Sequence, residues 1–192
     1  VADACHAAGI PVEAELGKVG GKEDDLIGGD NNPYTDPANP KERISRDKSY
    51  NTADGFIFQT EEARQYFSKE IQERSTIIIN PIDPTIPMPY DGIRDKTVVT
   101  VGRLVHQKNH ALLINAFVSF VEKYPKYQLH IYGEGPLRPV LQKQIDMLNL
   151  SNNVVLKGYC KNVLNEIRKS SMFVLPSDYE GISNALLEAL AL

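Results

Sequence analysis

The sequence predicts an α/β fold built on a parallel sheet, and three observations in its second half lead to that class. Apolar runs rich in β-branched residues recur, as in "TVVTVGRL" at 97–104, which is typical of buried strands. These runs alternate with segments whose apolar residues recur at helical spacing, as at 112, 113, 116, 117, 120 and 121. The links between them are short, which indicates parallel strands joined by right-handed helical crossovers.

Four strands and four helices are expected in alternation after residue 95. The strands are expected at 97–104, 128–135, 153–158 and 172–177, and the helices at 110–125, 137–149, 163–171 and 183–192. Four strands are few for a doubly wound domain. The sequence leaves open whether the third or the fourth strand has an open edge, and such an edge favours self-association.

The first half divides into three stretches. Residues 1–40 are rich in Gly, Asp, Asn and Pro and are expected to be mostly loop. Residues 41–81 are expected to hold a helical segment, a strand at 55–60, a helix at 61–71 and a strand at 75–81. Thr60 suits the N-cap of that helix, and two glutamates favour its first turn. Residues 82–95 contain three prolines and a glycine, so we expect a linker.

Composition and charge exclude several classes of protein. The 192 residues carry a net charge of −4 with acids and bases interspersed, which argues against a nucleic-acid partner. Cys5 and Cys160 lie far apart, and we interpret them as reduced thiols of a cytoplasmic protein. No apolar run is long enough to cross a bilayer, and the N-terminus has no signal peptide. Both ends are expected to be cuts within longer domains.

The candidate site lies at the ends of the predicted strands, because ligands of such sheets bind beyond the carboxyl ends. Arg103 and Lys108 follow the first strand. Two cations beside the N-terminus of a helix suit a diphosphate. Glycines that allow close backbone approach recur at the strand ends, at Gly102, Gly133, Gly135, Gly158 and Gly181.

Each of these residues also has a plainer interpretation. Arg103 and Lys108 alone are as well explained as surface charges. Glycines at strand ends are usually turn residues. The single histidines are interpreted as structural rather than as ligands, namely His106, His110 and His130. The convergence of four loops on one edge of the sheet favours the site.

Four stretches in order resemble the retaining GT-B glycosyltransferases of the group called family 4. They are "VGRLVHQKNHALLINAF", "LHIYGEGPLRPVL", "NVVLKGYCKNV" and "MFVLPSDYEGISNALLEALAL". The last contains that family's pair of glutamates with seven residues between them, Glu180 and Glu188. The resemblance covers residues 41–192, with 41–81 similar to the end of the family's N-terminal domain. It implies a Rossmann-like C-terminal half of a GT-B fold at 96–192, truncated before its last strands.

The resemblance implies a role for each matching residue. Arg103 and Lys108 match the pair that binds the donor's diphosphate, and Glu188 matches the acid that binds the ribose hydroxyls. Glu180 matches the acid near the transferred sugar, and we assign it to sugar binding and electrostatics rather than to nucleophilic attack. The backbone groups that would lie against the donor belong to Gly102, Gly181, Ile182, Ser183 and Asn184. The family generally needs no metal or other cofactor.

The first forty residues are similar to another family. "VADACHAAGIPVEAELGKVGGKEDDL" and the "YTDP" that follows resemble class II, metal-dependent sugar-bisphosphate aldolases. That resemblance would place Glu15 near a metal, but His6 and Glu15 alone offer too few ligands for a metal site. We therefore interpret this stretch as a foreign segment joined between about Gly29 and Lys41.

The resulting hypothesis is a retaining transferase of a nucleoside-diphosphate sugar, with uracil or guanine as the base and an unknown acceptor in polysaccharide or glycoconjugate synthesis. The chain as it stands is expected to be inactive alone. Peripheral membrane association of the full-length parent stays open. Two other classes also stay open: a nucleotide-binding module without turnover, and a fragment of a metal-dependent aldolase.

Overall fold

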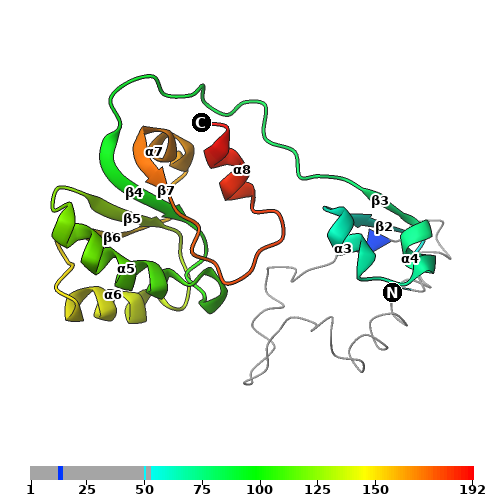
Figure 1. The fold of residues 1–192 in the computed structure, drawn as a ribbon, viewed down its shortest axis with the longest axis horizontal. Helices are drawn as coiled ribbons and strands as arrows, with labels where there is room; N and C mark the ends of the chain where they lie inside the picture. The colour runs from blue at the N-terminus through cyan, green and yellow to red at the C-terminus, as the bar shows by residue number, and fades with distance from the viewer. Residues whose placement is uncertain (1–12, 15–49, 51–52) are drawn as a thin grey trace. The chain divides into compact units, whose positions relative to one another are not determined.

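The computed structural model describes residues 13–14, 50 and 53–192 of the chain (Figure 1). They belong to two compact units, Val1–Asn80 and Pro81–Leu192, and each unit has its own sheet. Most of the expected loop at 1–40 and the expected helical segment after residue 41 lie outside the described residues. Among the residues that are described, no helix has both the length and the apolar character needed to cross a membrane.

The first unit contains a parallel sheet of three short strands, in the order β1-β2-β3. The strands are β1 (Glu13–Ala14), β2 (Gly55–Phe58) and β3 (Ser75–Ile77). Strand β1 pairs with β2 at Gly55 and Phe56. Alternate residues of β2 point into a small core, which consists of Ala53, Phe56, Phe58 and Ile71.

The single helix expected at 61–71 is wrong, because the structure divides that stretch into α3 (Glu61–Gln65) and α4 (Lys69–Glu73). The Thr60 hydroxyl accepts a hydrogen bond from the Ala63 amide at 3.1 Å, as expected of an N-cap. Ser68 then acts as a second N-cap, since its hydroxyl accepts from the Ile71 amide at 3.4 Å. A serine in this position competes with helix continuation and starts a new helix instead.

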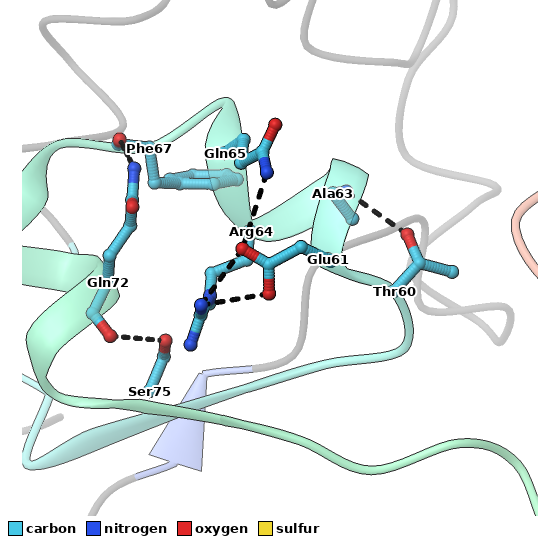
Figure 2. Close-up of polar contacts among 8 residues, drawn as sticks. All are labelled: Thr60, Glu61, Ala63, Arg64, Gln65, Phe67, Gln72 and Ser75. Carbon is cyan, nitrogen blue, oxygen red and sulfur yellow. Dashed lines mark hydrogen bonds and ion pairs between the residues drawn. The ribbon is translucent and has the colours of Figure 1, made fainter.

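Side-chain hydrogen bonds stabilise α3, the break after it and the end of α4 (Figure 2). Glu61 accepts from the Arg64 guanidinium at 2.9 Å, one turn along α3. The Gln72 amide of α4 donates to the Phe67 carbonyl at 2.7 Å, in the break between the helices. The Ser75 hydroxyl donates to the Gln72 carbonyl at 2.7 Å, so the end of α4 is bonded to the first residue of β3.

The second unit is a four-stranded parallel sheet in the order β6-β5-β4-β7. Its strands are β4 (Asp95–Val101), β5 (Gln128–Tyr132), β6 (Val154–Gly158) and β7 (Ser170–Phe173). This sheet confirms the α/β class and the parallel arrangement. Within the described residues β6 and β7, the third and fourth strands of this unit, both lie at an edge of the sheet. The expectation that only one of them has an open edge was too narrow. Strand β7 begins two residues before the expected start, because Ser170 is already extended.

Helices cover both faces of this sheet (Figure 1). Helices α5 (His110–Lys123) and α6 (Arg138–Met147) pack on one face, and α7 (Val163–Lys169) and α8 (Asn184–Leu190) on the other. Consecutive residues of β4 divide between the two cores, since Val98 packs with α5 and α6 while Val99 packs with α7. Burial of both faces explains why β4 is β-branched from Thr97 to Val101, without the alternation of polar and apolar residues that a half-exposed strand shows.

The strand order places a topological switch point between β4 and β7. From β4 the chain crosses to β5 and then to β6, and it returns to the opposite side of β4 for β7. The crossovers that follow β4 and β7 therefore leave the sheet on opposite sides of one crevice. Ligands of open parallel sheets bind in such a crevice.

Candidate active site

The loop after β4 lies tightly against the loop after β5. The Gly102 amide donates to the Tyr132 carbonyl at 3.0 Å, and the Leu104 amide donates to the Glu134 carbonyl at 2.9 Å. Gly133, between those two acceptors, has a φ of +140°. A Cβ at Gly133 would lie only 2.0 Å from the Gly102 carbonyl oxygen, so only glycine fits there.

The same loop then forms a short 3-10 turn, His106–Lys108, which leads into α5. Asn109 ends this turn in the left-handed conformation, with a φ of 43°. Its side chain caps α5 by accepting from the Leu112 amide at 3.3 Å. The turn and the cap together fix the position from which the Lys108 side chain projects.

Three hydrogen bonds join this loop to the loop after β7. The Asp178 amide donates to the Gln107 carbonyl at 2.9 Å. The Gln107 side chain donates to the Tyr179 carbonyl at 3.0 Å. The Asn109 side chain donates to the Asp178 carboxylate at 2.6 Å. The loops after β4 and β7, which lie about seventy positions apart in the chain, are therefore bonded to each other at the switch point.

These bonds place Lys108 directly opposite Glu180. The Lys108 ammonium lies 2.5 Å from a carboxylate oxygen of Glu180. About a fifth of each side chain is exposed, 21% for Lys108 and 19% for Glu180. A partly buried pair of this kind is screened by salt less than a surface pair. The structure thus brings together two of the residues that the sequence assigned to one site.

Arg103 and His110 lie before and after Lys108 along the chain, and they contact each other. The Arg103 side chain is exposed, and its carbonyl oxygen lies 3.2 Å from the His110 Nε2. A carbonyl only accepts, so the ring donates from Nε2, and the buried Nδ1 has no partner among the described residues. Burial lowers the pKa of His110, which is only 2% exposed, so a neutral ring supports the turn that carries Arg103.

The other predicted site residues follow Glu180 along the chain. Gly181 and Ile182 lead into α8, and the Ser183 hydroxyl caps that helix by accepting from the Leu186 amide at 3.4 Å. Asn184 is the first residue of α8, one residue after the expected start at 183. Glu188 lies half-buried further along α8, while the ion pair with Lys108 belongs to Glu180.

The metal ligands considered for the aldolase-like stretch, His6 and Glu15, lie outside the described residues, as does Cys5. Across 13–14, 50 and 53–192, no group of three His, Cys, Asp or Glu residues is arranged to hold a metal ion. Cys160 is a free, half-buried thiol.

Sequence reasoning missed the three polar residues that join the two loops, Gln107, Asn109 and Asp178. A signal was present for Asn109, because an asparagine directly before a helical pattern is a typical N-cap. No local signal pairs Asn109 with Asp178, since that contact depends on the strand order.

The family profile named "Glycosyl transferases group 1" matches residues 92–192. Among characterised and uncharacterised relatives, a glycosyltransferase of Methanocaldococcus jannaschii is 35% identical over 157 residues, which covers 74% of this chain and 39% of that protein. The poly(glycerol-phosphate) alpha-glucosyltransferase of Bacillus subtilis is 31% identical over 144 residues, which covers 72% of this chain and 21% of that protein. The chain thus spans two fifths or less of the length of these relatives.

Solved glycosyltransferases of the GT-B fold superpose on the chain. TarM from S. aureus, solved with UDP, has a TM-score of 0.67 and 28% identity, and the match covers 79% of this chain and 31% of that one. HepE from Anabaena, also solved with UDP, has a TM-score of 0.72 and covers 99% of this chain and 53% of that one. Its identity is 16%, so it supports the fold alone.

A second profile, that of class II fructose-bisphosphate aldolases, matches residues 1–54. That match lies almost wholly outside the described residues and extends beyond the junction expected between Gly29 and Lys41. The origin of this stretch stays a prediction.

The group 1 profile covers more than half of the chain, including both loops of the crevice. The chain therefore belongs to the group 1 family of glycosyl transferases.

Proposed function

We propose that the crevice between β4 and β7 binds a nucleoside-diphosphate sugar and that the parent enzyme transfers the sugar with retention of configuration. The observation that carries the proposal is the Lys108–Glu180 pair at the topological switch point. A cation and a carboxylate held side by side suit a ligand whose diphosphate is anionic and whose sugar becomes cationic during transfer.

The chemistry defines the role of each charge. The bond between the sugar's anomeric carbon and the diphosphate oxygen breaks, and a bond to the acceptor's hydroxyl oxygen forms in its place. The diphosphate gains negative charge as it leaves, and the acceptor's proton passes to it or to solvent. Lys108 and Arg103 lie in one loop, where they would stabilise that charge without a metal. Glu180 would stabilise the positive charge that develops on the sugar.

The donor's other contacts are assigned to the chain around α8. Glu188 would bind the ribose hydroxyls, and these contacts would be the same in the ground state and in the transition state. The backbone from Gly181 to Asn184, together with Gly102, would lie against the diphosphate. No cofactor is needed in this scheme, because cationic side chains do the work of a metal.

The parent enzyme is proposed to act in the cytoplasm, in polysaccharide or glycoconjugate synthesis, on an acceptor that is a polymer or a lipid-linked glycan. The names of relatives support an acceptor of this class, since they include a poly(glycerol-phosphate) glucosyltransferase and a poly(ribitol-phosphate) N-acetylglucosaminyltransferase. A diphospho-undecaprenol N-acetylgalactosaminyltransferase of Campylobacter jejuni is also a relative, 40% identical over 100 residues. That relative supports peripheral membrane association of the parent.

The test is the affinity of the chain for UDP and GDP, measured by isothermal titration calorimetry. Lys108→Ala should weaken binding of the preferred nucleotide by about tenfold or more, because a charge-assisted contact is worth about 1.5–3 kcal/mol. Lys143→Ala is the matched control, since it removes the same charge from an exposed position on α6. Binding that is equally tight in both variants would refute the assignment of Lys108, and no binding of either nucleotide would refute the donor site.

A further inference from the structure

We infer that Asn109 is a positioning residue, whose side-chain amide holds the loops of Lys108 and Glu180 in the register that the donor requires. The inference rests on the proposed donor site. The Asn109 side chain is hydrogen-bonded to Asp178 and Leu112 and to neither Lys108 nor Glu180 in these two bonds, so it would act through the geometry of the two loops.

The Asn109 amide makes two different hydrogen bonds at once. Its oxygen accepts from the Leu112 amide at 3.3 Å and so caps α5. Its nitrogen donates to the Asp178 carboxylate at 2.6 Å. The left-handed backbone at Asn109, with a φ of 43°, is a conformation that asparagine and aspartate tolerate better than most residues.

Contacts across the crevice alternate along the turn. Gln107 is bonded to the backbone of Asp178 and Tyr179, and Asn109 is bonded to the Asp178 side chain. Lys108, between them, reaches Glu180. The flanking bonds therefore fix the Lys108 ammonium and the Glu180 carboxylate as a unit, and loosening one flank would let the two charges separate.

The Asn109 amide makes both bonds because its oxygen accepts and its nitrogen donates. Aspartate at position 109 would still accept from the Leu112 amide and would still suit a helix N-terminus. It could not donate to Asp178, because an ionised carboxylate only accepts. Asn109→Asp would thus keep the cap and turn the bond across the crevice into a contact between two like charges.

The experiment uses four variants of the chain and one control. Asn109→Asp breaks the bond across the crevice. Asp178→Asn alone keeps an oxygen acceptor for Asn109. The double variant N109D/D178N restores a bond with donor and acceptor exchanged. The double variant N109D/D178A also removes the like charge at position 178 and has the same net charge as N109D/D178N, but it restores no hydrogen bond.

The control is Gln142→Glu on α6. The Gln142 amide donates to the Asp146 carboxylate at 3.1 Å, so this change also replaces an amide donor with a carboxylate opposite an aspartate. It lies on a helix that is no part of the crevice loops. It reports what the same chemical change does to the domain as a whole.

Two readouts are measured, the affinity for UDP by calorimetry and the hydrogen exchange of the Asp178 amide by NMR. We expect Asn109→Asp to weaken UDP binding by about five- to tenfold, equivalent to about 1–1.4 kcal/mol. Exchange of the Asp178 amide, bonded to Gln107 in the unchanged chain, should quicken by a similar factor. Asp178→Asn and N109D/D178N should bind UDP within about twofold of each other, N109D/D178A should stay weak, and exchange in β4 should not change.

Three outcomes would overturn the inference. The first is an affinity for UDP that is the same in Asn109→Asp and Gln142→Glu. The second is an affinity restored equally in N109D/D178N and N109D/D178A, and the third is faster amide exchange throughout β4. Equal rescue would mean that net charge alone determines binding. If the unchanged chain binds no UDP while the exchange of Asp178 follows the expected pattern, the proposed donor site fails and the role of Asn109 in holding the loops stands.

Discussion

Gly133→Ala is the most direct test of how the crevice is built. A Cβ at this position would lie 2.0 Å from the Gly102 carbonyl oxygen, and contacts below 3.0 Å are essentially never seen, so the two loops would have to separate by at least 1.0 Å. The bonds on either side, from Gly102 to Tyr132 at 3.0 Å and from Leu104 to Glu134 at 2.9 Å, would then exceed hydrogen-bonding distance.

The expected cost follows from these two bonds and the backbone. Two backbone hydrogen bonds contribute about 1 kcal/mol each, and holding alanine at a φ of +140° costs about 1–3 kcal/mol. The free energy of unfolding should therefore fall by about 3–5 kcal/mol, and Tm by about 10 °C.

The assay is denaturation followed by far-ultraviolet circular dichroism, because the chain has no tryptophan. Gly102→Ala is the matched control, since its Cβ would meet only the flexible Lys108 side chain, at 3.4 Å. It should cost less than about 1 kcal/mol. Equal stabilities of the two variants would show that the close approach of the loops does not constrain position 133.

Three further predictions concern single side chains. Glu180→Gln should change the affinity for UDP by less than about twofold, because the Gln oxygen can still accept from the Lys108 ammonium and hold it in place, and it should lower the kcat of sugar transfer in the parent enzyme, because the charge opposite the sugar is lost; an unchanged kcat would contradict this role of Glu180. Glu188→Gln should chiefly raise the donor KM, since ribose contacts are the same in ground and transition states; a loss confined to kcat would contradict this. Burial lowers the pKa of His110 below 6.5, so as the pH falls below about 6.5 the unfolded chain takes up the proton first and stability is lost. In urea denaturation, the free energy of unfolding of His110→Gln should fall less between about pH 7 and pH 5 than that of the unchanged chain. Part of the fall should remain, because burial also lowers the pKa of His130. An equal fall in both chains would contradict the role of His110.

The strands and helices of the second unit could be predicted because burial on both faces leaves a clear record in sequence. Strand β4 is β-branched at every position from Thr97 to Val101, and α5 repeats its apolar residues at helical spacing. The break between α3 and α4 was missed because the hydroxyl of Ser68 outweighs a helical pattern that continues on either side of it.

The site could be predicted only in part. Parallel strands place their carboxyl ends at one edge, so Lys108 and Glu180 were expected near each other. Their direct pairing could not be predicted, because it depends on β7 returning to the side of β4 opposite β5. For the same reason the role of Asp178 could not be predicted, since its partner Asn109 is 69 positions away.

The return of β7 to the side of β4 has a consequence for the order of folding. Strands β4 and β5 each pair with the next strand in sequence, whereas β4 and β7 pair across the whole of the intervening chain, and the Lys108–Glu180 contact spans 72 positions. Contacts of such long separation carry the largest loop-closure entropy and tend to form late. A chain with its first three strands assembled has a sheet but no crevice. A donor would therefore bind only the molecule whose last strand has docked, and at a hundred times its Kd it would favour that state by about 2.7 kcal/mol.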